Sequence, residues 1–462
     1  MVDDATSIIQ KIQQENVKFI DFRFTDLQGK FHHISMDASL FNEELLLNGI
    51  MFDSSSIAGW HSQNPDLLLI PDIETIHIDP FYAQSTMIFI CNVYDPITLQ
   101  PYNRDPRYTT KKAIEYLKKK EIGDTLLLGI KTDCFIFDNV HYTVSPTESG
   151  FTLESTEFAN NGKNKGHYSN AKSGYTLPPQ DKSHDMRSEI VSALNNIGVQ
   201  ITKYHNQANN AQHSFNLQHE SLLRSSDNLQ KYKYAVHQVA NSYCKTATFM
   251  PKPIDNNNGS GMHLSMSIRK EDMPVFAGDE CKGLSKTCLY YIGGIIKHAK
   301  ALNALTNAST NSYKRLLTCC QSPVQLVYST HNRSASCRIP YAKKADDQHI
   351  EIRFPDLTAN PYLAPAAILM AGLDGIANKI HPGKPMDKNI NELSSEGKKT
   401  IPRICYSLRE ALENLDNDRE FLKKGNVFDD DQIDAFIKIK MKEVLRLEQS
   451  PSPVEFEMYY SI

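Results

Sequence analysis

Hydrophobic and polar positions along the chain alternate between two spacings, which predicts a mixture of strands and helices. Near the N-terminus, residues 6–14 have helical spacing, and Lys18–Thr25 alternates with its apolar residues on one face. The turn at residues 26–30 leads into a second strand, so the two strands are expected to form a hairpin. With another strand at Met87–Tyr94, the first hundred residues predict a small α+β domain with a mostly antiparallel sheet.

A second and larger domain is expected to begin at Asp105, because aspartate caps helices and Pro106 suits a first helical turn. Beyond it, strand and helix patterns alternate. The expected helices lie at residues 186–197, 229–243, 284–305, 363–380 and from 401 to about 447, and the expected strands at 126–138 and 199–204. We therefore predict an α+β fold with two domains, residues 1–104 and residues 105–462, which the length of the chain permits.

Composition narrows the classes of function. The chain has a net charge of -4 with both signs interspersed, so it gives no electrostatic support for nucleic-acid binding. No apolar run is long enough to span a bilayer, and the acidic start MVDDATSIIQKIQQ does not fit a secretory signal. The nine cysteines lack paired metal-ligand spacing, so we expect free thiols in a reducing cytoplasm.

The strongest candidate site lies in KTATFMPKPIDNNNGSGMHLSMS, residues 245–267. Its two ends, residues 247–250 and 262–266, have the pattern of short strands. The prolines and glycines between them predict an open loop, and His263 follows directly on the second strand. From these residues alone, the segment is either a binding loop with a functional histidine or a glycine-rich hairpin with a packed histidine.

Two other polar segments are candidate loops. MFDSSSIAGW, residues 51–60, contains the only tryptophan, and functional residues concentrate in such loops. The alternative is a solvated loop that Trp60 anchors. Residues 146–182 are rich in glycine, asparagine and serine, and they are expected to form a long surface loop near the site.

These segments resemble, in order and in spacing, those of glutamine synthetase of the bacterial type I form. The resemblance is carried by VKFIDFRFTDLQGK, MFDSSSIAGW, NGSGMH, NRSASCRIP, IEIRFPD and SPVEFEMYYSI, and it extends from the first strand to the last residue. It implies a small N-terminal β-grasp-like domain and a larger C-terminal catalytic domain whose antiparallel strands form a half-barrel.

The resemblance also implies the family's reaction and assembly. In that reaction ATP phosphorylates glutamate and ammonia displaces the phosphate, with Mg²⁺ or Mn²⁺ as the metal. The family assembles as two stacked hexameric rings in the cytoplasm. The apolar C-terminal segment would insert into the opposite ring, and the alternative is a strand packed on its own subunit.

The anion-binding half of the family's site has counterparts throughout this chain. Its catalytic residues match Asp53, Arg333 and Arg353, its substrate-binding residues match Asn258, Gly259, His263, Arg315, Arg333 and Arg353, and its ATP-binding arginine matches Arg338. Asp53 would help to deprotonate ammonium and would reach into the site of a neighbouring subunit. Arginines suit these positions because phosphoryl transfer depends on stabilising negative charge.

The metal-binding half departs from the family, which holds its ions with five glutamates and one histidine. Asp133, His263 and Glu351 remain as expected metal ligands, whereas Lys131, Asn206 and Ser214 occupy positions where the ligand is lost. Mg²⁺ requires anionic oxygens because it gives up water reluctantly. At about 4 Å the ammonium of Lys131 would repel a cation by several kcal/mol. Lys131 could instead act as a point charge against phosphate, in place of a missing cation.

Three further positions differ from the family pattern. Ser265 stands where the family has a second histidine, Gln321 where it has a flap glutamate, and Asn391 where it has the adenylylation tyrosine. We therefore expect reduced metal occupancy.

Three hypotheses follow from these departures: an active enzyme with a reduced metal set, an impaired or inactive family member with a regulatory or structural role, and a ligase for another amine. The lost carboxylates favour the second. The third has least support, because such a ligase still needs metal-held ATP.

Overall fold

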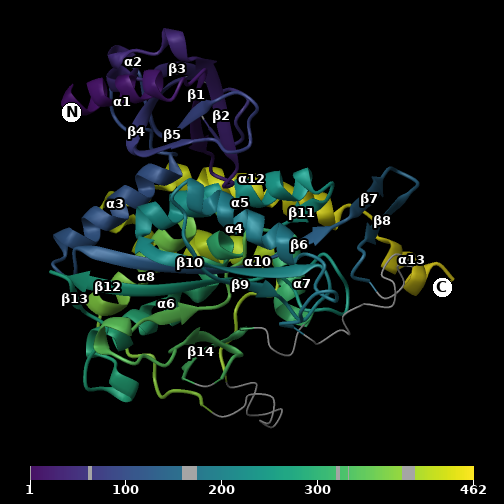
Figure 1. The fold of residues 1–462 in the computed structure, drawn as a ribbon. Helices are drawn as coiled ribbons and strands as arrows, with labels where there is room; N and C mark the ends of the chain where they lie inside the picture. The colour runs from purple at the N-terminus through teal and green to yellow at the C-terminus, as the bar shows by residue number, and fades with distance from the viewer. Residues whose placement is uncertain are drawn as a thin grey trace.

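The computed structural model describes residues 2–60, 65–158, 174–318, 323–330, 332–387 and 401–461. Within these residues a small N-terminal part lies beside a larger C-terminal part (Figure 1). Helices of the C-terminal part lie between the N-terminal sheet and the large sheet (Figure 1). Among the described residues, no helix has the length and apolar character needed to cross a membrane.

The N-terminal part contains one five-stranded sheet. Its elements are α1 (Val2–Gln14), β1 (Phe19–Thr25), β2 (Phe31–Asp37), α2 (Glu43–Asn48), β3 (Ile50–Asp53), β4 (Asp66–Ile78) and β5 (Thr86–Tyr94). The strand order is β2-β1-β5-β4-β3, and only the β1–β5 pair is parallel. The predicted β1–β2 hairpin and the mostly antiparallel sheet are therefore confirmed. The first helix begins earlier than residue 6, as its bounds show.

Trp60 anchors the segment of residues 51–60. Its side chain is 6% exposed, and its ring lies 5.6 Å from that of Phe24 and 5.3 Å from that of Tyr102, measured between centroids. Such aromatic contacts add to the free energy gained by burial. The anchoring role considered from the sequence is thus confirmed, and it holds the preceding Asp53 at the edge of the N-terminal sheet.

The C-terminal part is built on a nine-stranded sheet. Its strands are β6 (Thr125–Phe137), β9 (Ile201–Asn206), β10 (Gln212–Ser221), β11 (Thr246–Thr248), β12 (Met262–Lys270), β13 (Met273–Pro274), β14 (Gln325–Ser329), β15 (Ala335–Arg338) and β16 (Ile350–Ile352). The main order is β14-β15-β16-β12-β6-β10-β9, with β11 on β6 and β13 on β12. All strand pairs in this sheet except β14–β15 are antiparallel. In the order of the sheet, the neighbouring strands β15-β16-β12-β6-β10 form the expected curled half-barrel.

Most of the expected helices lie close to where the sequence predicts them, but the helix expected from 401 to about 447 begins only at Leu408 and is broken into separate helices. The helices that cover this sheet are α3 (Pro106–Lys119), α4 (His184–Asn196), α5 (Leu222–Ser242), α6 (Lys286–Thr306), α7 (Thr310–Thr318), α8 (Leu363–Ala377), α10 (Leu408–Asn417), α11 (Glu420–Lys423) and α12 (Asp430–Glu448). Asp105 caps α3, because its side chain accepts a hydrogen bond from the backbone N–H of Arg107 at 2.9 Å. The division of the chain into domains between residues 104 and 105 stays a prediction.

Two segments differ from the sequence-based expectation. The first part of the loop expected at 146–182 is a strand, because β7 (Asn139–Val144) and β8 (Ser149–Glu154) pair as a separate two-stranded sheet. Residues 159–173 lie outside the described residues. The C-terminal segment is not a strand but a helix, α13 (Pro453–Tyr459), whose capping box joins Ser452 and Glu455. In Figure 1, α13 projects at the edge of the molecule.

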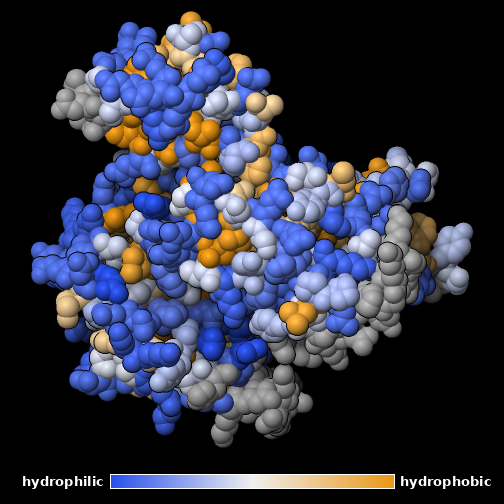
Figure 2. All heavy atoms as spheres, viewed as in Figure 1, coloured by the Kyte–Doolittle hydropathy of each residue, from blue (hydrophilic) through white to orange (hydrophobic). Residues whose placement is uncertain are grey.

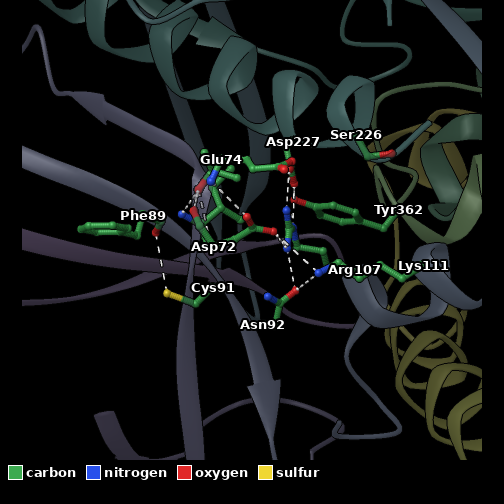
Figure 3. Close-up of polar contacts among 12 residues, drawn as sticks. Asp72, Glu74, Phe89, Cys91, Asn92, Arg107, Lys111, Ser226, Asp227 and Tyr362 are labelled. Carbon is green, nitrogen blue, oxygen red and sulfur yellow. Dashed lines mark hydrogen bonds and ion pairs between the residues drawn. The ribbon is translucent and has the colours of Figure 1, made fainter. Parts of the chain in front are cut away.

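Arg107, at the start of α3, joins the two parts of the molecule (Figure 3). Its Nε and Nη2 donate to the two carboxylate oxygens of Asp227 in α5, at 3.0 and 2.9 Å. Its Nη1 lies 2.8 Å from Oδ2 of Asp72 in β4 and donates to Oδ1 of Asn92 in β5 at 2.6 Å. The hydroxyl of Tyr362 also donates to Asp227, at 2.7 Å. The guanidinium thus contacts strands of one part and helices of the other.

The charges of this interdomain network balance once Lys111 is included, because its Nζ lies 3.6 Å from Oδ2 of Asp72. Arg107 is 2% exposed, and burial alone would lower its pKa, but the charge of Asp227 raises that pKa well above its ordinary value. Burial raises the pKa of Asp72, and the Arg107 charge outweighs this and lowers it. Hydrophobic residues are visible where the two parts meet on the face that Figure 2 shows. The junction therefore combines apolar packing with a paired charge cluster.

Candidate functional site

The loop of residues 249–261 interrupts a strand instead of joining a hairpin. β11 pairs with β6 at Phe135–Phe137, and β12 pairs with β6 at Thr125–Thr132, both antiparallel. The other edge of β6 is occupied by β10. β11 and β12 are therefore two successive segments of one discontinuous strand that pairs with β6. The interpretation of this segment as a glycine-rich hairpin is wrong. The loop leaves this edge beside Asp133, whose N–H donates to the carbonyl of Gly261 at 3.1 Å.

Close packing fixes the path of this loop. A Cβ on Gly259 would lie 2.6 Å from Cγ of Arg315 and would also clash with the carbonyl of Pro251, so only glycine fits there. The N–H of Ser260 donates to the same Pro251 carbonyl at 2.8 Å. Arg315 is 6% exposed and donates to the carbonyls of Phe354 and Pro355. The amino-acid-binding loop expected from the sequence is thus seated on a buried arginine.

Strand register places the expected site residues on one face of the half-barrel. Paired residues of neighbouring strands share a face, as do residues two apart in one strand. Lys131 lies opposite His263, Ser214 opposite Asp133, and Arg338 opposite Glu351. Glu351 also lies opposite Ser265, two residues beyond His263. Residues from five strands therefore converge above this face.

A cavity of about 190 Å³ opens on this face. Its lining includes eight expected site residues: Lys131, Asp133, Asn258, Gly259, His263, Arg315, Arg333 and Arg353. Arg338 and Glu351 lie beside it, because Glu351 contacts the cavity-lining His263 and Arg338 contacts Glu351. The structure thus brings together most of the residues that the sequence indicates.

Three other expected residues, Ser214, Asn206 and Asp53, are not in this lining. The Ser214 side chain is buried, and its Oγ donates to the carbonyl of Thr132 at 3.4 Å. The side-chain amide of Asn206 donates to Oγ1 of Thr176 at 2.7 Å. Asp53 is exposed at the edge of the N-terminal sheet, where its carboxylate accepts from the N–H of Ser55.

Two further expected residues, Gln321 and Asn391, lie outside the described part of the chain. So do Cys319 and Cys320, whereas the seven described cysteines are free, as expected.

Glu351 is fully engaged by cations and by His263. Its Oε1 lies 2.9 Å from Nδ1 of His263, and its Oε2 accepts from Nη1 of Arg338 at 3.1 Å and lies 3.8 Å from Nε of Arg353. Burial raises the pKa of Glu351, but the His263 hydrogen bond and the arginine charges outweigh it, so the pKa lies well below its ordinary value. Both carboxylate oxygens are therefore already occupied.

His263 is held as a neutral ring with one nitrogen toward the cavity. Burial lowers its pKa, as do the charges of Arg353 and Lys131, while Glu351 raises it. A neutral ring whose Nδ1–H donates to Glu351 leaves Nε2 as an acceptor, a tautomer that we infer from the contact. The histidine can thus accept a proton or a hydrogen bond, or offer one ligand atom.

The cations of the cavity have few acceptors. The Arg353 side chain is 12% exposed, and its buried Nε and Nη1 have no hydrogen-bond partner in the described structure. Burial lowers the pKa of Arg353, the charge of Glu351 raises it, and the charges of the other arginines lower it, so that the pKa lies below its ordinary value. Asp133 is the one carboxylate in the described lining, and its Oδ1 accepts from Nε2 of Gln207 at 2.8 Å. This arrangement attracts anions.

Sequence reasoning missed two glutamines of this site. Gln207 bonds Asp133, and Nε2 of Gln212 donates to the carbonyl of Gly259 at 3.2 Å. Both lie in the segment of residues 204–215. That segment matches the family only loosely, so the sole signal was their position beside Asn206 and Ser214.

Comparison with known proteins decides the family. Residues 16–96 match the glutamine synthetase β-grasp domain, and residues 103–459 match the glutamine synthetase catalytic domain. The chain belongs to the glutamine synthetase family. This is a family of ligases of glutamine biosynthesis, and the resemblance noted in the sequence is confirmed, together with the β-grasp and catalytic domain folds.

Relatives and solved structures agree with this assignment over the whole chain. The chain is 54% identical to glutamine synthetase of Rhizobium meliloti, over 99% of each chain. It is 48% identical to glutamine synthetase of Escherichia coli, over 99% of this chain and 100% of that one. The Plasmodium falciparum glutamine synthetase structure superposes with a TM-score of 0.91 at 27% identity, covering 99% and 98% of the two chains.

Proposed function

We propose that this chain is a glutamine synthetase family protein that binds the anionic ligands of the family but catalyses the ligation of ammonia to glutamate poorly. One observation carries the proposal: Lys131 stands opposite His263 where the family pattern has a carboxylate. Of the two carboxylates nearby, Glu351 is engaged by His263, and Asp133 accepts a hydrogen bond at one of its oxygens. An inactive member with a regulatory or structural role is the limiting form of the same proposal.

The donor atoms do not fit the divalent ions that the family uses. Mg²⁺ and Mn²⁺ prefer several anionic oxygens around one position. Here Glu351 is engaged by His263 and two arginines, and Asp133 is hydrogen-bonded to Gln207. Within the described residues, no group of three or more His, Cys, Asp or Glu side chains is placed to hold an ion. We therefore propose, from the chemistry of these side chains, that Mg²⁺ or Mn²⁺ binds here with reduced occupancy.

The anion-binding half of the site supports ligand binding. Arg315, Arg333 and Arg353 line the cavity and would neutralise phosphate and carboxylate groups, while Arg338 beside them would contact ATP. The loop at Asn258 and Gly259 would hold the amino-acid substrate, glutamate. In this proposal ATP and glutamate bind, but the transferred phosphoryl group lacks the cations that stabilise its developing charge.

An assay of glutamine formation tests this proposal. Purified full-length chain would be supplied with glutamate, ammonia and ATP, in Mg²⁺ and separately in Mn²⁺. Loss of several kcal/mol of transition-state stabilisation predicts a rate about a thousandfold or more below that of the Escherichia coli relative assayed alongside. A rate near that of the relative in either metal would refute impairment and favour an active enzyme with a reduced metal set.

We further propose that the chain works in the cytoplasm as a homo-oligomer of two stacked hexameric rings. Asp53 lies outside the cavity of its own chain, which suits a residue that completes a neighbour's site. Helix α13 exposes a row of apolar side chains, Val454, Phe456, Met458, Tyr459 and Tyr460, which suits insertion into another subunit. The free thiols of the described cysteines suit a reducing compartment.

The mass of the purified chain in solution tests the assembly. We expect a dodecamer, and deletion of residues 453–462 is expected to yield smaller assemblies, because the apolar side chains of α13 would then be missing. A full-length chain that is monomeric at micromolar concentration would contradict the assembly proposal without affecting the proposal on ligand binding.

A further inference from the structure

The cavity contains two cationic side chains with N–H donors that no described residue accepts from. Lys131 is half-buried and makes no hydrogen bond or ion pair with any other described residue. Arg353 has two buried N–H groups without a partner among the same residues, although its side chain is only 12% exposed. Buried donors in native proteins are nearly always satisfied. Arg353 has its charge partly compensated by Glu351, 3.8 Å away, but the open donors of Lys131 and Arg353 at one small cavity indicate an acceptor that comes from a ligand.

The charge of the described lining indicates what kind of ligand this is. Lys131, Arg315, Arg333 and Arg353 contribute positive charge, and Asp133 alone contributes negative charge. A single carboxylate from a ligand would leave most of this excess uncompensated. A phosphate dianion carries two charges and several acceptor oxygens, which suit the fork of a guanidinium and the point charge of an ammonium. A cavity of about 190 Å³ is also smaller than most ligand sites, so it suits a small group.

We propose that this cavity binds the phosphate dianion of its ligand directly, without a divalent cation, and that Lys131 and Arg353 supply the charge that metal ions supply elsewhere in the family. This inference rests on the proposed function, because it takes the site to be an anion-binding site. It goes further by making the binding independent of metal. The phosphate can be inorganic phosphate or the terminal phosphate of a nucleotide.

If binding does not depend on a metal ion, Mg²⁺ should not strengthen the binding of a nucleotide. Mg²⁺ binds the phosphates of a nucleotide in solution and lowers their negative charge. If Lys131 occupies the place of a cation, the Mg²⁺ complex of the nucleotide would meet repulsion at Lys131. The affinity of the cavity for the nucleotide is then highest without Mg²⁺, or it does not depend on Mg²⁺. A site that holds its phosphate through metal ions behaves in the opposite way.

Calorimetric titration of the full-length chain tests this inference with two probes, ADP and inorganic phosphate. Each is titrated in EDTA and in Mg²⁺ at constant ionic strength. We expect both probes to bind in EDTA, with no more than about a threefold gain from Mg²⁺. If only ADP binds, the phosphate comes from a nucleotide. Lys131→Gln is expected to weaken binding in EDTA by about tenfold or more, because it removes a charge-assisted hydrogen bond.

Matched variants separate a local role of Lys131 from a general effect of charge. Lys131→Arg keeps the charge and should retain most of the affinity, whereas Lys131→Glu should abolish binding in EDTA. Lys118→Gln removes an exposed lysine of α3 and should leave binding unchanged. Thermal unfolding of each variant confirms that it is folded before titration.

The results that would overturn this inference differ from those that would overturn the proposed function. Binding only in the presence of Mg²⁺, no binding of either probe, or binding in EDTA that Lys131→Gln leaves intact would each overturn the inference. A chain that forms glutamine slowly but needs Mg²⁺ to bind ADP would refute this inference and keep the proposed function. A chain that forms glutamine rapidly yet binds ADP in EDTA would refute the proposed function alone.

Discussion

A variant that carries Lys131→Glu, Asn206→Glu and Ser214→Glu together is expected to bind Mn²⁺ and to form glutamine at least about a hundredfold faster than the natural chain. The three changes replace one ammonium and two neutral groups with carboxylates. Lys131 and Ser214 lie opposite His263 and Asp133 on the same face of the sheet, so new carboxylates at these two positions would converge with Asp133. Several anionic oxygens around one position are what these ions require, and a bound ion stabilises transition-state charge by several kcal/mol.

Single and double variants show whether the loss is distributed. Lys131→Glu alone should not rescue activity, because Asn206 and Ser214 still supply only neutral groups. Metal binding is followed by titration with Mn²⁺, and activity by glutamine formation. If Lys131→Glu alone restores as much activity as the triple variant, the lysine is the sole defect. If the triple variant binds no Mn²⁺, the ion pairs of Glu351 or another feature of the site prevent binding, and our account of the lost ligands is incomplete.

The second large effect is expected at Arg107. Arg107→Met should lower the free energy of unfolding by about 3–5 kcal/mol, because Asp227 is then buried without its charge partner, while Asp72 keeps only the Lys111 ammonium at 3.6 Å. Urea unfolding at neutral pH measures this loss. Arg107→Lys should recover only part of it, because an ammonium cannot make the paired contacts that the guanidinium makes with Asp227 (Figure 3).

An exposed ion pair provides the matched control for this measurement. Arg409 contacts Glu448 at the surface, where each side chain is more than a third exposed, so Arg409→Met should change the free energy of unfolding far less than Arg107→Met. A loss at Arg107 that is no larger than the loss at Arg409 would contradict the role of the interdomain network. A large loss at both would indicate a general effect of removing arginine.

Much of the fold could be predicted because its signals are local. The alternation in Lys18–Thr25 and the pair Asp105–Pro106 each identify an element from neighbouring residues alone. The C-terminal helix also had a local signal, since Ser452 and Glu455 have the spacing of a capping box, but the apolar character of the segment favoured insertion or a strand. The pairing of β11 and β12 had no local signal, because it depends on β6, which lies more than a hundred residues earlier.

In the candidate site, as in the fold, residues within short motifs could be predicted, whereas contacts between distant strands could not. The motifs located the arginines, the loop and His263, and the structure gathers them at one cavity. The ion pairs of Glu351 could not be predicted, since Arg338 and His263 reach it from two other strands. Likewise, the hydrogen bond from Gln207 to Asp133 depends on how β9 and β10 meet, which no motif records.

The discontinuous strand formed by β11 and β12 has an evolutionary consequence. Both pieces are anchored to β6, so residues 249–261 form a detour whose two ends are fixed independently of its length. Changes in the part of the detour away from Gly259, where only glycine fits, can therefore accumulate without shifting His263 or its neighbours. Descendants of one ancestral scaffold could in this way change which small molecule they recognise while the face beneath it stays in register.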